Sequence, residues 1–364
     1  MQINIKIPSS LFSRLGSFFA RQKVETIIAI CAVIAATLAT AYYYSIDAII
    51  AYGDSESHLN IAKRIVHSIT PGMAQAGGIW LPIPHLLMVP LVAIEPLYRT
   101  GLAGSIVSGI AYVLSCVFLY KTAYFLTKRK IAGIVASIVF GLNPNILYMQ
   151  STPMTELVLI VFFILSGYYF IRFISDQENI SLLILAAFFG FCATLSRYDG
   201  WFLVMFEAMV LGLLYIPQRK MWAKLQGLVV LYGSLAFVGI LMWFAWGYMI
   251  LGDPLYFTNS QFSAKSQQNN WLARGELPAY HNVVEAAKYY IATSWSNTGV
   301  IIFLIAVVGF ILFLFQRQYK YRFFIALVLL VPFIFNILTM FLGQSVIFIP
   351  SLTPVSFEWR LFNV

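Results

Sequence analysis

Long runs of apolar residues, separated by short polar segments, dominate the chain between residues 27 and 342. Most of these runs approach the roughly 20 residues that a helix needs to cross a bilayer, so each is predicted to be a membrane-spanning helix. We expect about nine spans, near residues 27–44, 102–126, 131–148, 155–174, 181–195, 201–216, 226–250, 298–316 and 322–342. The pattern predicts an all-α polytopic membrane protein with one transmembrane domain over 27–342.

Two long polar stretches, 45–100 and 252–297, interrupt the series of spans and are predicted to be the main extramembrane loops. The first stretch contains two candidate short helices. One runs from Ser57 to Ser68. The other, from Ile83 to Leu97, carries three prolines, and we expect it to lie along the membrane interface.

The two ends of the chain, outside the predicted transmembrane domain, are predicted to form different structures. Residues 9–19 place several large apolar side chains near one helical face beside basic residues, so 1–26 is predicted to form an interfacial helix on an anionic membrane surface. Residues 343–364 are expected to form an external tail that leads toward a further span.

Composition and charge agree with a membrane protein. Hydrophobic residues make up 60% of the chain and charged residues only 10%, whereas soluble domains carry about 25% charged residues. The net charge of +9 would suit nucleic acid, but 15 of the 23 basic residues fall on the side of the membrane that holds the N-terminus. This distribution follows the positive-inside rule. We therefore expect a multi-pass cell-membrane protein with a cytoplasmic N-terminus, bound by membrane lipids and not by nucleic acid.

The opposite side of the membrane carries ten of the 14 acidic residues, and it is predicted to be external: periplasmic, or lumenal in a eukaryote. No tight cluster of Cys and His predicts a metal site, and a divalent metal stays open as a cofactor. The three cysteines lie in apolar runs, which favours core packing over a disulfide framework.

The first cluster of candidate chemistry follows the first span and contains Asp54, Glu56 and His58. If Asp54 caps a helix, Glu56 and His58 fall in its first turn, where the helix dipole favours acids without any further function. A carboxylate near the interface is also suited to accept a proton from an incoming hydroxyl group. Both interpretations are open for Glu56 and His58, and Asp54 is the candidate base.

Two further clusters follow on the same side of the membrane. Glu156 stands at the predicted start of a span, where the dipole alone explains an acid. Arg197, Tyr198 and Asp199 stand between two spans. Arg197 suits either an ordinary ion pair with Asp199 or a lipid phosphate group, which a guanidinium binds through two parallel hydrogen bonds.

Two isolated charges complete the candidates. Lys265 lies in the second long loop, after a Gly-Asp-Pro turn, and is either a second phosphate contact or a solvated lysine. Glu207 is the one acidic residue deep inside a predicted span. Such an acid is a functional candidate, although a hydrogen bond to a neighbouring helix explains it equally well.

These motifs together resemble the GT-C fold of polyprenyl-phosphate-sugar-dependent glycosyltransferases, in the branch that contains protein O-mannosyltransferases and the aminoarabinose transferase of lipid A. The resemblance covers residues 27 to about 265, in order and with matching topology. It rests on Asp54 in the first external loop, Trp80-Leu81-Pro82-Ile83-Pro84-His85, Asn143-Pro144, Met154-Thr155-Glu156, Arg197-Tyr198-Asp199-Gly200-Trp201 and Gly252-Asp253-Pro254-Leu255.

The resemblance implies an active site at the external membrane face. It implies a polyprenyl-phosphate sugar as donor and a lipid, glycan or protein as acceptor. Asp54 matches the acid of the family's first loop, proposed as the catalytic base, and Glu156 matches the acidic position of the second external loop. Arg197 falls where a basic residue would meet the lipid phosphate, and Glu56, His58, Tyr198, Asp199 and Lys265 are the further substrate-binding candidates.

Three other functions compete with this interpretation: a lipid or solute transporter or flippase, a glycan polymerase or ligase, and a non-catalytic membrane subunit. Transporters usually combine repeats with broken helices and paired charges near the middle of the membrane. Here the polar residues gather at external helix ends, and two long acid-bearing loops suit an enzyme better than a passive subunit.

Overall fold

The computed structural model describes residues 23–215 and 222–345, and all the regular secondary structure in these ranges is helical. The predicted interfacial helix at 9–19 and most of the predicted tail at 343–364 lie outside the described residues. The prediction of an all-helical membrane protein is confirmed.

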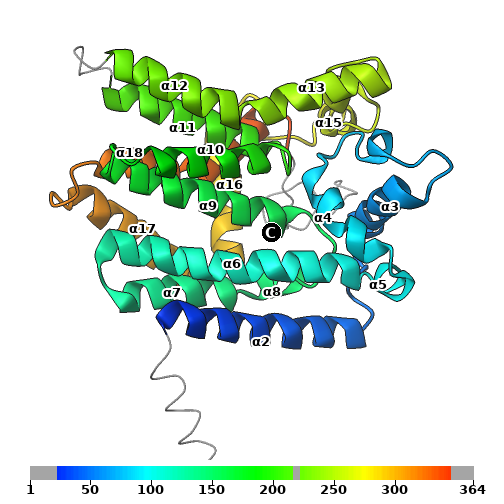
Figure 1. The fold of residues 1–364 in the computed structure, drawn as a ribbon, viewed down its shortest axis with the longest axis horizontal. Helices are drawn as coiled ribbons and strands as arrows, with labels where there is room; N and C mark the ends of the chain where they lie inside the picture. The colour runs from blue at the N-terminus through cyan, green and yellow to red at the C-terminus, as the bar shows by residue number, and fades with distance from the viewer. Residues whose placement is uncertain (1–22, 216–221, 346–364) are drawn as a thin grey trace, which may run out of the picture.

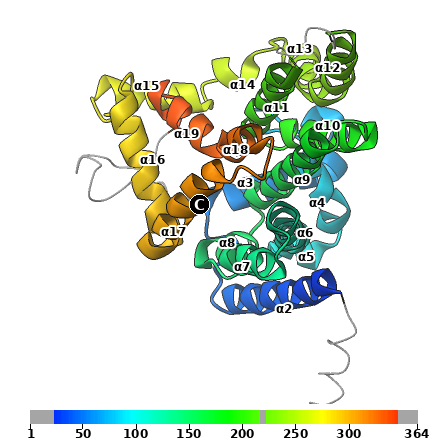
Figure 2. The same ribbon diagram turned by 90° about the vertical axis from the view of Figure 1, so that its left-hand side faces the viewer.

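The apolar runs fold into helices that lie side by side in a bundle. Figure 2 shows α2, α6, α9, α10 and α11 as successive layers, with α16 and α17 along one flank. The largest hydrophobic core of the described residues is formed mainly by α9 to α12 together with α18. The bundle consists of α2 (Val24–Ser45), α6 (Leu102–Thr127), α7 (Lys130–Gly141), α8 (Pro144–Met149), α9 (Glu156–Ser175), α10 (Ile180–Thr194), α11 (Asp199–Tyr215), α12 (Trp222–Ala236), α13 (Val238–Leu251), α16 (Val283–Thr298), α17 (Val300–Phe315), α18 (Arg322–Leu329) and α19 (Val331–Phe341).

Only some of the described helices are long and apolar enough to cross a membrane unbroken. These are α2, α6 and α9, and the number rises to six if each of three bent helix pairs is one span. The predicted span at 322–342 is such a pair, since α18 and α19 meet at an angle of 47°. Pro332 lies in the first turn of α19, where its missing N–H costs nothing but where it cannot continue the preceding helix. The count of nine crossings stays a prediction.

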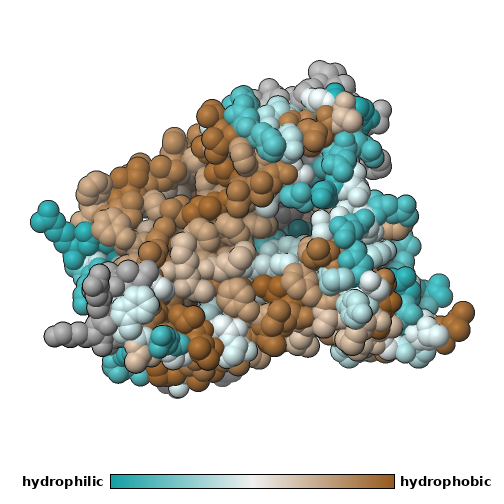
Figure 3. All heavy atoms as spheres, turned by 90° about the horizontal axis from the view of Figure 1, so that it is seen from above, coloured by the Kyte–Doolittle hydropathy of each residue, from teal (hydrophilic) through white to brown (hydrophobic). Residues whose placement is uncertain are grey.

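Polar groups gather at the two ends of the bundle. In Figure 1, α2 begins and α6 ends at the left, whereas α3 and α5 lie at the right. Seen from above, the surface is a broad hydrophobic band with hydrophilic residues toward both ends of the long axis (Figure 3). The hydrophilic residues on this face therefore lie toward opposite ends of the bundle, and the assignment of the loops to the two sides of a membrane stays a prediction.

The first long loop folds into a small helical unit outside the bundle, composed of α3 (Gly53–His67), η1 (Met73–Gln75), α4 (Ile83–Val92) and α5 (Glu95–Arg99). The helix predicted at 57–68 starts earlier, at Gly53, and its N-cap is Tyr52. The expectation that Asp54 caps this helix is therefore wrong. Asp54 and Glu56 both lie inside its first turn, where the dipole favours an acid.

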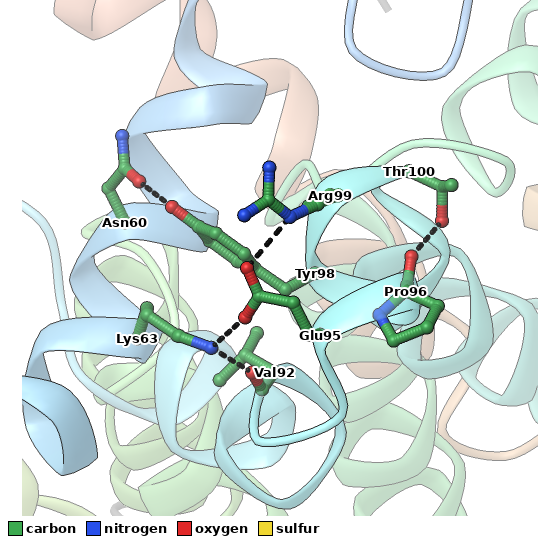
Figure 4. Close-up of polar contacts among 8 residues, drawn as sticks. All are labelled: Asn60, Lys63, Val92, Glu95, Pro96, Tyr98, Arg99 and Thr100. Carbon is green, nitrogen blue, oxygen red and sulfur yellow. Dashed lines mark hydrogen bonds and ion pairs between the residues drawn. The ribbon is translucent and has the colours of Figure 1, made fainter.

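A cluster of polar contacts fastens α3 to α4 and α5 (Figure 4). Lys63 Nζ donates to the carbonyl oxygen of Val92 at 3.0 Å and to a carboxylate oxygen of Glu95 at 2.8 Å. Arg99 Nε donates to the other oxygen of Glu95, also at 2.8 Å. Tyr98 adds a hydroxyl bond of 2.5 Å to Asn60. These contacts fix the helix that carries Asp54.

Close packing of α6 fixes the loop that leads into α9. Ser105 Oγ donates to the carbonyl oxygen of Ser151 at 2.6 Å, and Ser108 Oγ donates to that of Thr152 at 3.0 Å. A Cβ atom at Gly104 would lie 2.2 Å from Pro153, so only glycine permits this approach. The contacts set the position of the residues that begin α9.

Glu207 is completely buried in α11, among three other helices. Its carboxylate accepts a hydrogen bond of 2.6 Å from the hydroxyl of Tyr232 in α12 and one of 2.9 Å from that of Ser166 in α9. The carbonyl oxygen of Ala186 in α10 lies 2.9 Å from the Ser166 hydroxyl and is the alternative acceptor of its single proton. Hydrogen bonds to neighbouring helices therefore account for the presence of Glu207 inside a predicted span, without any catalytic role.

We predict that Gly104→Ala lowers stability by about 1–3 kcal/mol, because the added methyl group meets backbone atoms of Pro153 that cannot move independently. Thermal unfolding of the purified protein in detergent measures the change. Gly227→Ala is the matched control, since nothing lies within 4 Å of a Cβ at that helical position. Equal melting temperatures for the two variants would contradict the packing argument.

Candidate active site

A pocket of about 470 Å³ opens where α9, α11 and α19 meet the segments outside the bundle. Its polar wall includes Arg197, Asp199 and Lys265, and its aromatic wall includes Trp80, Trp201 and Phe257. These residues come from four separate parts of the chain, and the fold brings them together. A space with cations at one wall and aromatic rings at another suits an anionic ligand with an apolar or sugar portion.

Arg197 lies between two carboxylates of the site. Its Nη1 atom donates to Glu156 Oε1 at 2.8 Å and to the hydroxyl of Thr155 at 3.1 Å. Its Nε atom lies 3.6 Å from Asp199 Oδ2. The sequence anticipated the ion pair with Asp199 but not the shorter one with Glu156, because residue 156 begins α9 whereas residue 197 lies in the turn between α10 and α11.

Local backbone features hold this cluster in place. Thr155 is the N-cap of α9 and Glu156 its first residue, as predicted. The turn that carries Arg197 folds back tightly on α10, since a Cβ at Gly200 would lie only 2.2 Å from the carbonyl oxygen of Ala193. Trp201 Nε1 donates to the carbonyl oxygen of Thr194 at 2.8 Å and ties the same turn down.

Asp54 lies within electrostatic reach of this cluster. Burial among protein atoms raises its pKa above the ordinary value of 3.8, the negative charge of Glu156 raises it further, and Arg197 opposes both effects. The residue nevertheless stays accessible to solvent. An accessible carboxylate with a raised pKa is a stronger proton acceptor than an ordinary aspartate.

A roof segment, residues 73–83, covers one side of the pocket. Tyr198 donates its hydroxyl to the carbonyl oxygen of Ile79 at 2.7 Å and stacks its ring on Phe257 with centroids 4.9 Å apart. The N–H of Ile83 donates to the carbonyl oxygen of Leu195 at 3.0 Å. Tyr198, predicted as a substrate-binding residue, therefore joins the roof to the α10–α11 turn while lining the pocket.

His58 is buried behind the pocket and does not line it. Its Nδ1 atom lies 2.9 Å from Nε2 of His85, and its ring meets that of Trp80 edge-on at 4.8 Å. Burial is the main reason why the pKa of His58 lies well below 6.5 and that of His85 falls to about 4, so both are neutral at physiological pH. Glu56 is exposed and is not among the described residues that line the pocket.

Lys265 is exposed at the second residue of α15 (Ala264–Ala273), whose N-cap is Ser263. Sequence could not place it, but the fold brings it to the same pocket as Arg197. It forms no ion pair with another described residue. Lys265 is thus a cation of the pocket with no carboxylate partner among residues 23–215 and 222–345.

Sequence reasoning missed two polar residues of the pocket, Asn336 and Thr339 of α19. They lie three positions apart and so share one face of the helix. Their signal in the sequence is a polar pair within the otherwise apolar run that predicts the span 322–342. Within residues 23–215 and 222–345, no group of three or more His, Cys, Asp or Glu side chains is placed to hold a metal ion.

One comparison with known proteins gives a match. The family model described as dolichyl-phosphate-mannose-protein mannosyltransferase matches residues 97–246. This range includes Glu156 and Arg197 to Asp199 but neither Asp54 nor Lys265. No curated protein and no solved structure matches the chain. The match supports a membrane glycosyltransferase of the GT-C type that uses a polyprenyl-phosphate sugar.

We predict that Arg197 and Glu156 are energetically coupled by about 1–2 kcal/mol, between the values of exposed and buried ion pairs because both side chains are partly exposed. A double-mutant cycle with Arg197→Gln and Glu156→Gln, read by the free energy of unfolding, measures the coupling. The exposed Lys288–Glu285 pair, which lies outside the pocket, is the control and should give a smaller value. Additive effects at positions 156 and 197 would contradict the pairing.

Proposed function

We propose that this protein transfers a sugar from a polyprenyl-phosphate donor to a hydroxyl or amine acceptor at the external face of the membrane. The observation that carries the proposal is the pocket at the end of the helix bundle that combines Lys265, the Arg197 cluster and an aromatic wall. The match to a mannosyltransferase family model over residues 97–246 supports the same class of reaction.

The chemistry follows from the groups present. The acceptor oxygen or nitrogen attacks the anomeric carbon of the sugar, and the bond from that carbon to the phosphate oxygen breaks. Asp54 takes the proton that the acceptor loses, a contribution of about 10²–10⁴-fold for a well-placed base. The polyprenyl phosphate leaves with the electron pair, and its negative charge is met by the cations of the pocket.

The two cations have different parts in this proposal. Lys265 is exposed and unpaired with the other described residues, so its ammonium group is available to the phosphate. Arg197 already contacts two carboxylates, and it also lines the pocket. Arg197 therefore serves both as a phosphate contact and as the group that orients Glu156 and moderates the pKa of Asp54.

The proposed activity is tested by adding polyprenyl-phosphate mannose, labelled in the sugar, to the purified protein in liposomes together with a crude membrane fraction as the source of acceptors. Transfer appears as label that leaves the donor for a larger product, with release of polyprenyl phosphate. A parallel reaction with a polyprenyl-phosphate pentose distinguishes the sugar class. Failure to consume either donor, when the protein is folded and correctly oriented, contradicts the proposal.

Asp54→Asn should lower kcat by at least about 100-fold, because the amide keeps the shape of the side chain but cannot accept the proton. In the parent, activity should fall as the pH drops through the raised pKa of Asp54, since protonation removes the base. Glu156→Gln should move this acidic limb to lower pH, because it removes a negative charge that raises the pKa.

The control for this prediction is Asp253→Asn, an external aspartate whose carboxylate accepts hydrogen bonds from Leu255 and Asn259 in a surface turn. It should leave kcat within about threefold of the parent value, as expected for a change outside the reacting groups. If Asp54→Asn kept more than about a tenth of the parent rate, a general-base role would be excluded.

Lys265→Met should raise KM for the polyprenyl-phosphate sugar by about 10-fold, which is the loss of one charge-assisted hydrogen bond of roughly 1.5 kcal/mol. Donor titration measures the effect. Lys288→Met removes an external lysine that does not line the pocket and should leave KM unchanged. Equal KM values for the two variants would remove Lys265 from the phosphate site.

A further inference from the structure

A groove with a volume of about 610 Å³ lies between α2 and α6, on a part of the molecule that the active-site pocket does not reach. Its walls are almost entirely apolar, with Ile110, Val113 and Leu114 from α6 and Val33 and Ala36 from α2. It runs from Tyr44 and Leu102, where these helices meet the external segment, toward the middle of both helices. Both helices are apolar enough to span the membrane, so hydrocarbon chains of lipids are its ordinary surroundings.

Two buried polar residues, Ser105 and Gln150, line this groove, and Gln150 is completely inaccessible to water. Its amide nitrogen donates to the carbonyl oxygens of Ala36 and Leu147, both at 3.2 Å, and to Ser151 Oγ at 2.7 Å. Two of these partners are carbonyl oxygens, which can only accept hydrogen bonds. The NH₂ group of the Gln150 amide must therefore face them, and this fixes the orientation of the amide. The amide oxygen, Oε1, has no hydrogen-bond partner among the described residues.

The oxygen of Gln150 lies against α6 at Gly109. A Cβ at position 109 would lie 3.4 Å from it, and Gly109 itself lines the groove. Seven residues separate Gly109 from Leu102, so the oxygen lies about 10 Å along α6 from the external end of the groove. An acceptor without a donor at this depth in hydrocarbon costs several kcal/mol.

Water is a poor partner for this oxygen. A buried water molecule typically makes about three hydrogen bonds, but three hydroxyl groups that line the groove already donate to other protein groups. Thr37 donates to the carbonyl oxygen of Val33, Thr40 to Ser151 Oγ, and Ser105 to the carbonyl oxygen of Ser151. The groove thus offers a strong unmet acceptor within an apolar channel, which matches a hydrocarbon chain that carries its own donor.

We propose that the groove between α2 and α6 is a binding site for a membrane lipid whose hydrocarbon chain bears a hydroxyl group, with that hydroxyl donating to Oε1 of Gln150. The apolar walls hold the chain, and the amide oxygen selects for the hydroxyl. A plain isoprenoid chain has no such donor, so the occupant differs from the polyprenyl portion of the proposed sugar donor. The site does not depend on the proposed transfer reaction.

The test compares two lipids that differ only in a mid-chain hydroxyl group, 10-hydroxyoctadecanoic acid and octadecanoic acid. The full-length protein is placed in nanodiscs of dioleoylphosphatidylcholine, and each lipid is titrated while the unfolding temperature is followed, which gives an apparent Kd. We expect the hydroxylated lipid to bind about 5–10-fold more tightly, as one net hydrogen bond provides. Equal affinities would overturn the proposal.

Two variants locate the site. Gly109→Leu fills the groove in front of the amide oxygen and should weaken binding of the hydroxylated lipid by at least about 10-fold. Gly227→Leu adds the same side chain to an open position of α12 and should change nothing. Binding that survives Gly109→Leu unchanged would place the lipid elsewhere and overturn the assignment.

A third variant isolates the hydrogen bond. Gln150→Leu removes the acceptor and should abolish the preference between the two lipids while retaining chain binding. Gln150→Leu also removes hydrogen bonds that the amide makes to neighbours within the protein. The folding of this variant is therefore checked first, by its unfolding transition without lipid. If Gln150→Leu does not fold, the parent selectivity and the Gly109→Leu result still decide the proposal.

Discussion

Hydrocarbon does not tolerate an unpaired charge, and this constraint determines where the candidate chemistry of the protein lies. Charged side chains are expensive at the centre of a bilayer, so they collect where helices end and water begins. Glu156 begins α9, Asp199 begins α11, and Arg197 stands between α10 and α11. Because α9, α10 and α11 are neighbours in the bundle, the same rule that expels these charges from the spans also brings them together.

The pairing of Arg197 with Glu156 then decides what the site offers to a ligand. Glu156 is mostly covered by protein, and a carboxylate in such a place needs a partner of opposite charge. Here the guanidinium compensates Glu156 and also limits the rise in the pKa of Asp54. Lys265 is left as a cation without an acidic partner among the described residues, which is the condition for binding an external anion.

The segment outside the bundle acts as a wall of this site and not as a flexible loop. Lys63 and Glu95 fasten α3 to α4 and α5, His85 supports His58 behind the ring of Trp80, and Tyr198 holds the roof at Ile79. The neutral imidazole pair is suited to this setting because it satisfies one polar atom of each ring without introducing a charge. These contacts allow Asp54 to be accessible and yet fixed in position.

The sequence by itself determined the class of fold and the helix ends at which charged residues stand, because hydrophobic periodicity and the cost of charge in a bilayer are local properties of a segment. It also identified Glu156 as a helix-start acid and Arg197 as half of an ion pair with Asp199. It did not determine that Arg197 reaches Glu156, that Lys265 and Asn336 share the same pocket, or that His58 is turned away from that pocket toward His85. These facts depend on which helices become neighbours and on close contacts such as those at Gly104 and Gly200. Packing between distant segments leaves no periodic signal in the sequence, so only the tertiary structure decided them.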